Sequence, residues 1–238
     1  MKRMKWACGA AVLCTVTAPV PAPAQEDRPF LATVSAAAEE DDDQVWSGSA
    51  WTQRDKRLGK SGVNVECAFE PRLSLQFELS RARPRVAGGE SSLEAEAELK
   101  WLYNNIARDG WGIGLSMTAG AAKEGDAGWR AGNWQLVVPF SWQWSPAGGL
   151  LHLNAGLARE LGQKRETLAS AGVEVPLARS LVGFAELARS GEERLTHAGV
   201  RWWLKRERYA LDLSTYRRRP ELGGATTGWV LNFNLYDL

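Results

Sequence analysis

The chain contains few of the residues on which disulfide-stabilised folds and soft-metal sites depend. Its 238 residues include three cysteines, three methionines and two histidines. Cys8 and Cys14 lie near the N-terminus, so Cys67 alone remains in the rest of the chain, which excludes an internal disulfide framework there. Soft metals require thiolate, thioether and imidazole ligands. We therefore expect no metal site and no cofactor.

Long hydrophobic runs are also missing. Beyond residue 24 no stretch of about 18 apolar residues occurs, so we expect no transmembrane helix. The mean hydropathy of −0.30 does not exclude a membrane protein, because only every second residue of a transmembrane β-strand faces lipid. The formal net charge of +1 provides no excess of positive charge, and we expect no nucleic-acid partner.

The N-terminus has the three parts of an export signal. Lys2, Arg3 and Lys5 are basic, Trp6–Val16 is apolar, and Ala22-Pro-Ala24 is a small-x-small cleavage site. We therefore predict that residues 1–24 are a cleaved secretory signal peptide. Removing its three positive charges takes the formal charge from +1 to −2.

Beyond the signal, apolar and polar residues alternate in segments of about ten residues. Leu73, Leu75, Phe77 and Leu79, for example, share one face of such a segment. Period-two alternation is typical of β-strands with two different faces. It predicts eleven strands: 62–69, 72–82, 92–103, 110–120, 133–145, 149–159, 166–177, 180–189, 194–205, 207–216 and 225–237. Residues 45–52 supply a twelfth.

The links between these strands follow a rhythm of short and long. Short links are expected at 70–72, 104–109, 146–149, 178–179 and near 206, and longer links at 83–91, 120–132, 160–165, 190–193 and 217–225. Bacterial outer-membrane barrels have short periplasmic turns, longer extracellular loops and an even number of strands. The fold class is therefore all-β: a transmembrane antiparallel up-and-down β-barrel over residues 44–238, with twelve strands, or ten as the alternative.

Residues 25–43 differ from the rest in composition. They end in the acidic run Glu39–Asp43 and contain little apolar surface. Such a segment gains too little from burial to offset the entropy of ordering. We expect a flexible acidic periplasmic tail, with a short plug in the barrel mouth as the alternative.

The strand parity divides side chains between lipid and lumen. Charge is costly on the lipid face, and the opposite parity assigns these residues to the lumen: Glu66, Glu78, Glu94, Glu96, Glu98, Lys100, Glu174, Glu186, His197, Arg201 and Asp212. Aromatic belts mark the two membrane interfaces of a barrel. We assign to them Trp101, Trp111, Trp134, Trp142, Trp144, Trp202, Tyr209 and Trp229, with Trp203 beside them.

Two features of the lumen and the loops leave alternatives open. The lumen charges either pair and fill a closed interior or line a water-filled path. We expect no catalytic residues, because no pattern connects either histidine to a serine. Arginines concentrate near the expected outer loops, and contact with lipopolysaccharide phosphates or recruitment of anionic solutes would explain them: Arg54, Arg57, Arg81, Arg83, Arg85, Arg217, Arg218 and Arg219.

The final strand departs from the usual pattern. Tyr236 and Leu238 hold one parity, whereas Trp229, Leu231 and Phe233 hold the other. A β-bulge, or a chain end beyond the final pleat, would reconcile the two.

The segment Gly62–Leu79, and the later pieces Val182–Leu187 and Gly199–Trp202, resemble strands of putative outer-membrane transporters associated with phenol degradation. The resemblance implies a transporter barrel in the outer membrane of a Gram-negative bacterium, surrounded by lipid and lipopolysaccharide. From the sequence we expect a passive channel for small solutes with a charged lumen. The alternative is a closed structural or interaction barrel that binds a partner through its tail or outer loops.

Overall fold

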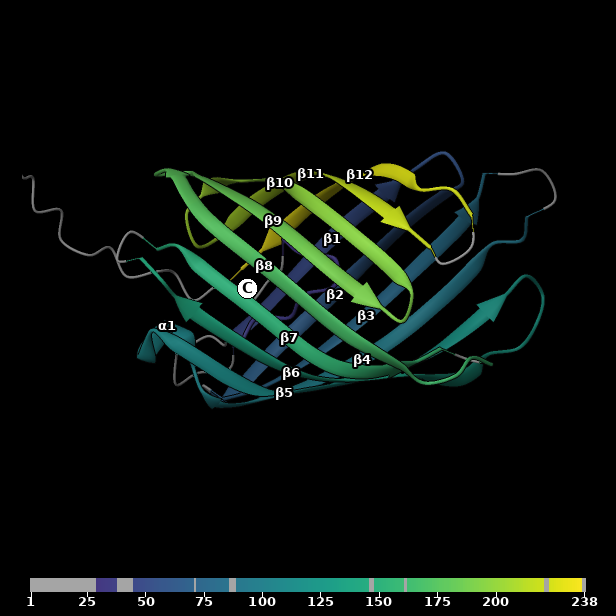
Figure 1. Cartoon of the computed structure of the whole chain (residues 1–238), viewed down its shortest axis with the longest axis horizontal. Helices are drawn as coiled ribbons and strands as arrows, with labels where there is room; N and C mark the ends of the chain where they lie inside the picture. Colours follow the sequence, from purple (N-terminus) through teal and green to yellow (C-terminus); the bar gives the residue numbers. More distant parts are fainter. Residues whose placement is uncertain are drawn as a thin grey trace, which may run out of the picture.

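The computed structural model describes residues 29–37, 45–70, 72–85, 89–145, 148–160, 162–220 and 223–236. In this part of the chain, twelve antiparallel strands form one closed barrel (Figure 1). The predicted fold with twelve strands is confirmed, and the alternative with ten is wrong. The strands are β1 Val45–Arg54, β2 Leu58–Glu70, β3 Leu73–Pro84, β4 Ser92–Asn104, β5 Trp111–Glu124, β6 Arg130–Gln143, β7 Leu150–Arg159, β8 Glu166–Ala178, β9 Leu181–Ser190, β10 Glu193–Lys205, β11 Tyr209–Arg219 and β12 Thr226–Leu235.

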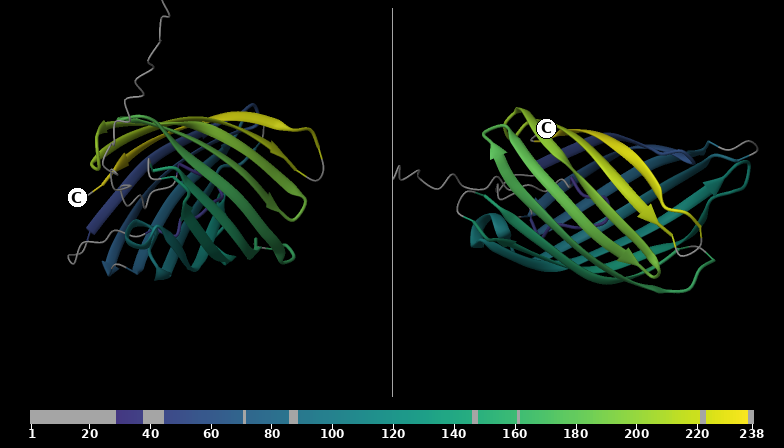
Figure 2. Two further views of the ribbon diagram at one scale, coloured as in Figure 1. Left: turned by 60° about the vertical axis from the view of Figure 1, so that its left-hand side comes forward. Right: turned by 45° about the horizontal axis from the view of Figure 1, so that its top comes forward.

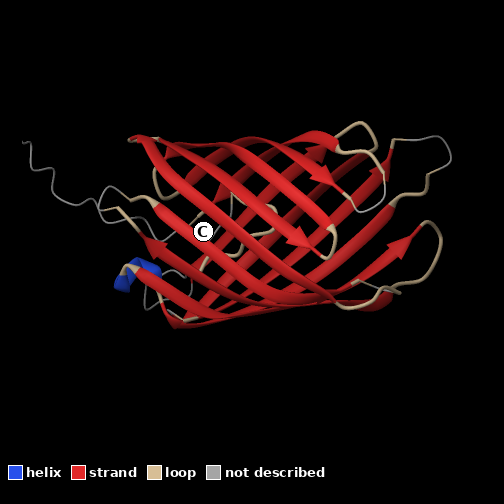
Figure 3. Cartoon of the chain, viewed as in Figure 1, coloured by secondary structure: helices blue, strands red, loops and turns tan. Residues whose placement is uncertain are grey.

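The barrel closes where β1 pairs with β12, from Gly48 opposite Leu235 to Arg54 opposite Trp229. Closure leaves no strand edge unpaired. Figure 2 shows the closed wall from two further directions. With an even number of strands, β1 begins and β12 ends at the same end of the barrel. We call this end the α1 end, because the single helical turn α1 (Ile106–Asp109) lies there, and the opposite end the far end (Figure 3).

Helix α1 is a local feature of the link between β4 and β5. The Asn105 side chain accepts a hydrogen bond from the N–H of Ala107, and Gly110 ends the turn with a φ of 72°. No helix in the described ranges is long and apolar enough to cross a membrane. The predicted signal peptide lies outside the described residues.

Alternation along the strands determines which face each side chain occupies. On β3, Phe77 and Leu79 are 56% and 50% exposed on the outer face, whereas Ser74 and Ser80 are buried on the inner face. Successive residues alternate between the two faces, because neighbouring side chains of a strand point in opposite directions. Apolar side chains therefore cover the outside of the barrel and polar ones fill the inside.

The predicted rhythm of the links is wrong in part. The link expected to be long at 190–193 is the two-residue turn 191–192, which Gly191 permits with a φ of 54°. At the α1 end, the links 105–110 and 144–149 are as long as 160–165 and 220–225 at the far end. Links are nevertheless longer on average at the far end, where the longest one, 85–91, lies.

The final strand needs no bulge. β12 pairs in unbroken register with β1 and β11. Leu231 and Phe233 face outward, whereas Asn234 and Tyr236 are buried on the inner parity. The Tyr236 ring packs 5.2 Å from the ring of Trp203 inside the barrel. Tyr236 thus belongs to the interior and not to a lipid-facing terminal pattern.

Candidate functional site

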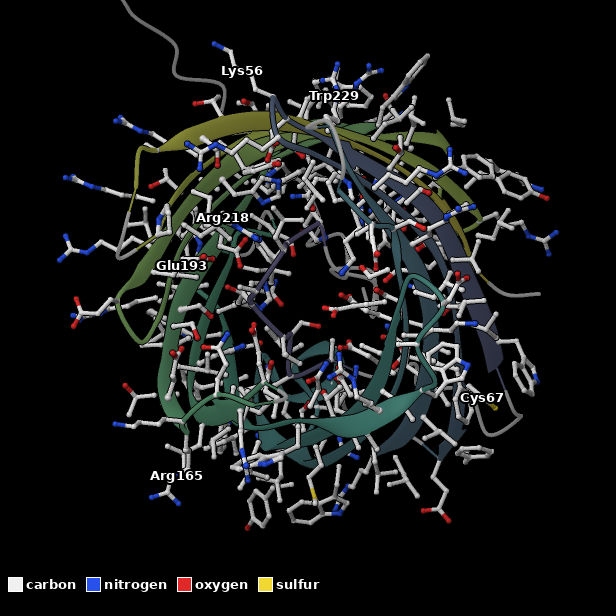
Figure 4. All side chains as sticks on the ribbon, turned by 90° about the vertical axis from the view of Figure 1, so that its right-hand side faces the viewer. Lys56, Cys67, Arg165, Glu193, Arg218 and Trp229 are labelled. Carbon is white, nitrogen blue, oxygen red and sulfur yellow. The ribbon has the colours of Figure 1, made fainter. Side chains whose placement is uncertain are left out.

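Residues 29–37 lie inside the barrel, and we call them the plug segment. Thr33, Val34 and Ala36 are at most 1% exposed. In the end-on view their purple trace runs within the ring of strands (Figure 4). The expectation of a flexible periplasmic tail is wrong for these residues, because this stretch contains no charge and its small side chains fit the lumen. The rest of 25–43 lies outside the described residues.

Barrel side chains satisfy the backbone of the plug segment. The N–H groups of Leu31 and Ala32 both donate to the Glu186 carboxylate at 2.9 Å. The N–H of Ala36 donates to Ser141 Oγ at 2.8 Å, and the Ala36 carbonyl accepts from the N–H of Ile106 at 3.3 Å. Buried backbone groups require such partners, and the inner wall provides them.

The first anchor is a row of three polar residues on β6, β7 and β8. Ser141 Oγ lies 2.7 Å from His152 Nδ1. His152 Nε2 lies 3.3 Å from Glu174 Oε1, a contact without hydrogen-bond geometry. All three residues are buried. The row fixes the hydroxyl that holds the Ala36 N–H.

A second row mirrors the first on β9, β10 and β11. Ser214 Oγ lies 2.8 Å from His197 Nε2, and His197 Nδ1 lies 3.3 Å from Glu186 Oε2. A hydroxyl and a carboxylate on opposite ring nitrogens also occur in Ser-His-Asp hydrolases. Here, however, the carboxylate also binds two N–H groups of the plug segment, so the row serves as its second anchor. The sequence assigned His197 to the lumen but gave no pattern that connects either histidine to a serine, because strand pairing alone brings these residues together.

Phe30 locks the plug segment between the two rows. Its ring centroid lies 5.4 Å from the His152 ring and 6.0 Å from the Phe184 ring, and both contacts are edge-to-face. The ring sits against Gly172 of β8, where an added Cβ would lie 2.9 Å from it. A glycine on the inner face of a strand was the one sequence signal for this close approach.

Between the plug segment and the far end, the barrel wall surrounds a cavity of about 890 Å³. Residues 29–32 form part of its lining. Five predicted lumen residues also line it: Glu78, Glu94, Glu96, Glu98 and Asp212. The other six are buried outside this lining: Glu66, Lys100, Glu174, Glu186, His197 and Arg201.

Ion pairs fill the interior below the cavity. Arg201 binds Asp212 through two hydrogen bonds of 2.6 and 2.7 Å, and Asn234 donates to the same carboxylate at 2.9 Å. Lys100 Nζ lies 3.3 Å from Glu66 Oε1. Because buried charges need partners to offset their desolvation, these contacts stabilise a packed interior in this half.

Acidic residues concentrate on one wall of the cavity. Glu78 of β3 stands directly opposite Glu96 of β4, and Glu94 and Glu98 lie on the same face of β4. Lys60 neutralises Glu94 at 2.7 Å. In the described residues no group of three or more His, Cys, Asp or Glu has the arrangement of a metal site. The wall thus forms an acidic surface beside the cavity.

The predicted interface aromatics divide between the two ends. Near the α1 end, six are between 38% and 51% exposed: Trp101, Trp111, Trp142, Trp144, Trp202 and Tyr209. Trp229 lies near the far end and is 42% exposed, whereas Trp134 is partly buried and contributes to the cavity lining. Trp203, expected beside them, is buried inside, because it shares the parity of Arg201.

Among the described residues of the far end, Asp55 has a carboxyl group with a perturbed pKa. Burial acts to raise the pKa of Asp55, but hydrogen bonds from the N–H groups of Arg57 and Leu58 lower it below its usual value. The Tyr216 hydroxyl donates to the same carboxylate at 2.9 Å. Asp55 thereby ties the β1–β2 link to β11.

Comparisons with known proteins bear on the fold. No protein-family model and no curated protein matches the chain. Among solved structures, the KdgM porin in complex with disordered oligogalacturonate is similar, with 9% identity, a TM-score of 0.63, and coverage of 79% of this chain and 98% of that one. The NanC porin has 7% identity, a TM-score of 0.59, and coverage of 81% and 100%. The COG4313 outer membrane channel from Pseudomonas putida F1 has 12% identity, a TM-score of 0.52, and coverage of 81% and 95%.

At these identities the likeness establishes the fold alone. The chain has the barrel architecture of outer-membrane channels, over nearly the full length of each of these three proteins. The resemblance to transporters associated with phenol degradation is not specifically supported by them.

Proposed function

We propose that this protein is a passive outer-membrane channel for small solutes, and that its plug segment closes it in the structure described. The observation that carries the proposal is the cavity of about 890 Å³, which residues 29–32 of the plug segment help to line. The plug segment is held by hydrogen bonds and ring contacts, whereas each strand of the wall is paired along both sides. The plug segment is therefore the part of the interior that leaves at the least cost.

Placement in the membrane is supported by the outer surface. Strands of 10 to 14 residues reach or exceed the roughly 9–11 residues that a tilted transmembrane strand needs. Large apolar side chains such as Leu187, Phe77 and Leu213 are 55–62% exposed on the outer face. A water-soluble barrel would cover such surface. We place the α1 end in the periplasm, because both barrel termini lie there and the chain would be exported through that compartment.

The acidic wall favours neutral or cationic solutes. Glu78, Glu96 and Glu98 line this wall, whereas basic residues such as Arg130 and Arg159 line other parts of the cavity. A low-dielectric wall strengthens the field of the acidic group. An acidic sugar such as the oligogalacturonate present with KdgM would be repelled by this wall. The identity of the solute is otherwise open, and the aromatic compounds implied by the resemblance are among the candidates.

Planar-bilayer conductance tests the proposal. The full chain is expected to stay closed for most of the recording, and a variant lacking residues 29–37 is expected to conduct steadily. Should the deletion fold poorly, Phe30→Ala is the milder variant, because it removes the ring that packs against His152 and Phe184 and leaves the backbone contacts in place. If both variants fold and both stay closed, the channel proposal is wrong.

The packed interior favours a second candidate, a closed barrel that binds a partner. Its observation is the set of buried ion pairs in the α1 half, such as Arg201 with Asp212. In that case the folded deletion variant would remain closed and would lose capture of the partner. The same experiment therefore separates the two functions.

A further inference from the structure

Arginines form a row on the outer face near the far end of β9, β10 and β11. Arg194 lies directly opposite Arg189 on one side and Arg219 on the other, and all three are exposed. Like charges directly opposite each other destabilise a sheet. An anionic partner would relieve the repulsion within this row of guanidinium groups.

The members of this row differ in their contacts. Arg189 is engaged, because its Nε donates to the Gly191 carbonyl at 2.7 Å and its Nη2 lies 3.6 Å from Glu192. Within the described part of the chain, neither Arg194 nor Arg219 makes a hydrogen bond or an ion pair. Two adjacent guanidinium groups thus remain available.

These two arginines line a groove of about 240 Å³ together with Glu192 and Pro220. Glu192 opposes anion binding, but its carboxylate lies beside Arg189, which partly offsets it. Arg217, two residues before Arg219 on the same face, is also exposed and adds positive charge. Arg218, expected in the outer loops, faces inward and lies 3.2 Å from Glu193 (Figure 4).

The groove lies where the apolar outer surface ends. Further along the same strands toward the α1 end, Leu187, Val200 and Leu213 are 62%, 37% and 55% exposed on the outer face. If the barrel spans a membrane, as proposed above, this boundary is at the level of the lipid headgroups. Planar guanidinium groups match phosphate oxygens through paired, charge-assisted hydrogen bonds.

We infer that Arg194 and Arg219 bind a phosphate group of a membrane lipid, namely the phosphorylated headgroup of lipopolysaccharide in the outer leaflet. We infer a lipid and not free phosphate as the ligand, because the groove adjoins the apolar surface that acyl chains would cover. It is separate from the cavity, since neither arginine contributes to the cavity lining. The inference rests on the proposed placement in the membrane but not on conduction.

The test uses the folded full-length barrel in detergent and three probes: bis-phosphorylated lipid A, its dephosphorylated counterpart and inorganic phosphate. Binding is measured by native mass spectrometry after folding has been checked by heat-dependent gel mobility. The double variant Arg194→Gln/Arg219→Gln is expected to bind lipid A at least roughly tenfold more weakly, since hydrogen bonds to charged groups are lost.

The matched control is Arg165→Gln/Arg179→Gln, which removes the same two charges from exposed links (Arg165 is labelled in Figure 4). It should change the affinity by less than about twofold, because exposed single charges contribute little. Should the first variant not fold, Arg194→Lys/Arg219→Lys replaces it. It retains the charge but loses the paired donors, so weaker binding is again expected.

Three results would overturn the inference. Equal weakening in the test and control variants would mean that binding follows overall charge. Equal binding of dephosphorylated lipid would exclude phosphate recognition, and equally tight binding of inorganic phosphate would make the groove a free-anion site. Because no conductance is measured, a failed channel proposal would leave this test unaffected.

Discussion

The Glu186 carboxylate offers the sharpest test of how the plug segment is held. It accepts the N–H groups of Leu31 and Ala32 at 2.9 Å each and is 1% exposed. In Glu186→Gln, one oxygen still accepts, but the new amide points an N–H group at a backbone donor. Hydrogen bonds to charged groups contribute about 1.5–3 kcal/mol each. The loss of one such bond, about 2 kcal/mol, would shift the closed–open equilibrium roughly 30-fold toward the open state.

Single-channel recording in planar bilayers measures this shift as the open fraction. The deletion of residues 29–37 gives the fully open reference, and the full chain gives the closed one. The control is Glu78→Gln, which also removes one negative charge. Glu78 lines the cavity and lies on β3, across the barrel from β9. It should leave the open fraction unchanged and alter only the ion preference.

A second variant perturbs a different contact of the plug segment, the one between Phe30 and Gly172 of β8. Gly172→Ala places a methyl group 2.9 Å from the nearest atom of the Phe30 ring, which is too close for an ordinary contact. The ring must move, so the open fraction should rise. Gly128→Ala, where an added Cβ meets nothing within 4 Å, is the neutral comparison.

An open fraction in Glu186→Gln that equals that of the full chain, while the deletion conducts, would refute the proposed role of Glu186.

Three further predictions concern the wall and the links. Arg201→Met should lower the free energy of unfolding by about 3–5 kcal/mol, measured by urea titration in detergent, because it leaves the Asp212 carboxylate buried without its partner; a loss below about 1 kcal/mol would show that the ion pair is dispensable. The lowered pKa of Asp55 means that this carboxylate adds stability at pH values above its unfolded pKa, and that the contribution disappears as the pH falls through the folded pKa. Asp55→Asn should therefore flatten the melting temperature against pH in the acidic range, and an unchanged profile would contradict the assignment. In the channel opened by deletion of the plug segment, Glu96→Gln/Glu98→Gln should reduce cation preference in reversal-potential measurements, and an unchanged reversal potential would show that the acidic wall does not set selectivity.

The amino-acid sequence alone determined the strands and the facing of their residues. Side-chain direction in a strand has a strict period of two, so Leu79 and Glu78 could be assigned to opposite faces without knowledge of any neighbour. The same local pattern predicted eleven strands, and the even number typical of a barrel favoured residues 45–52 as the twelfth. The link at 191–192 was misjudged because a tight turn depends on the backbone angle of one glycine, Gly191.

Only the tertiary structure decided what the inward-facing residues do. Glu96 lines a cavity and Glu186 is buried against the plug segment, yet both carry the same parity signal. The difference arises because residues 29–37, distant in sequence, occupy one half of the lumen and not the other. Their lack of charge and their small side chains permit this position, but the hydrogen-bond acceptors that hold them come from strands more than a hundred residues away. Contacts of that range depend on barrel closure, which no local pattern encodes.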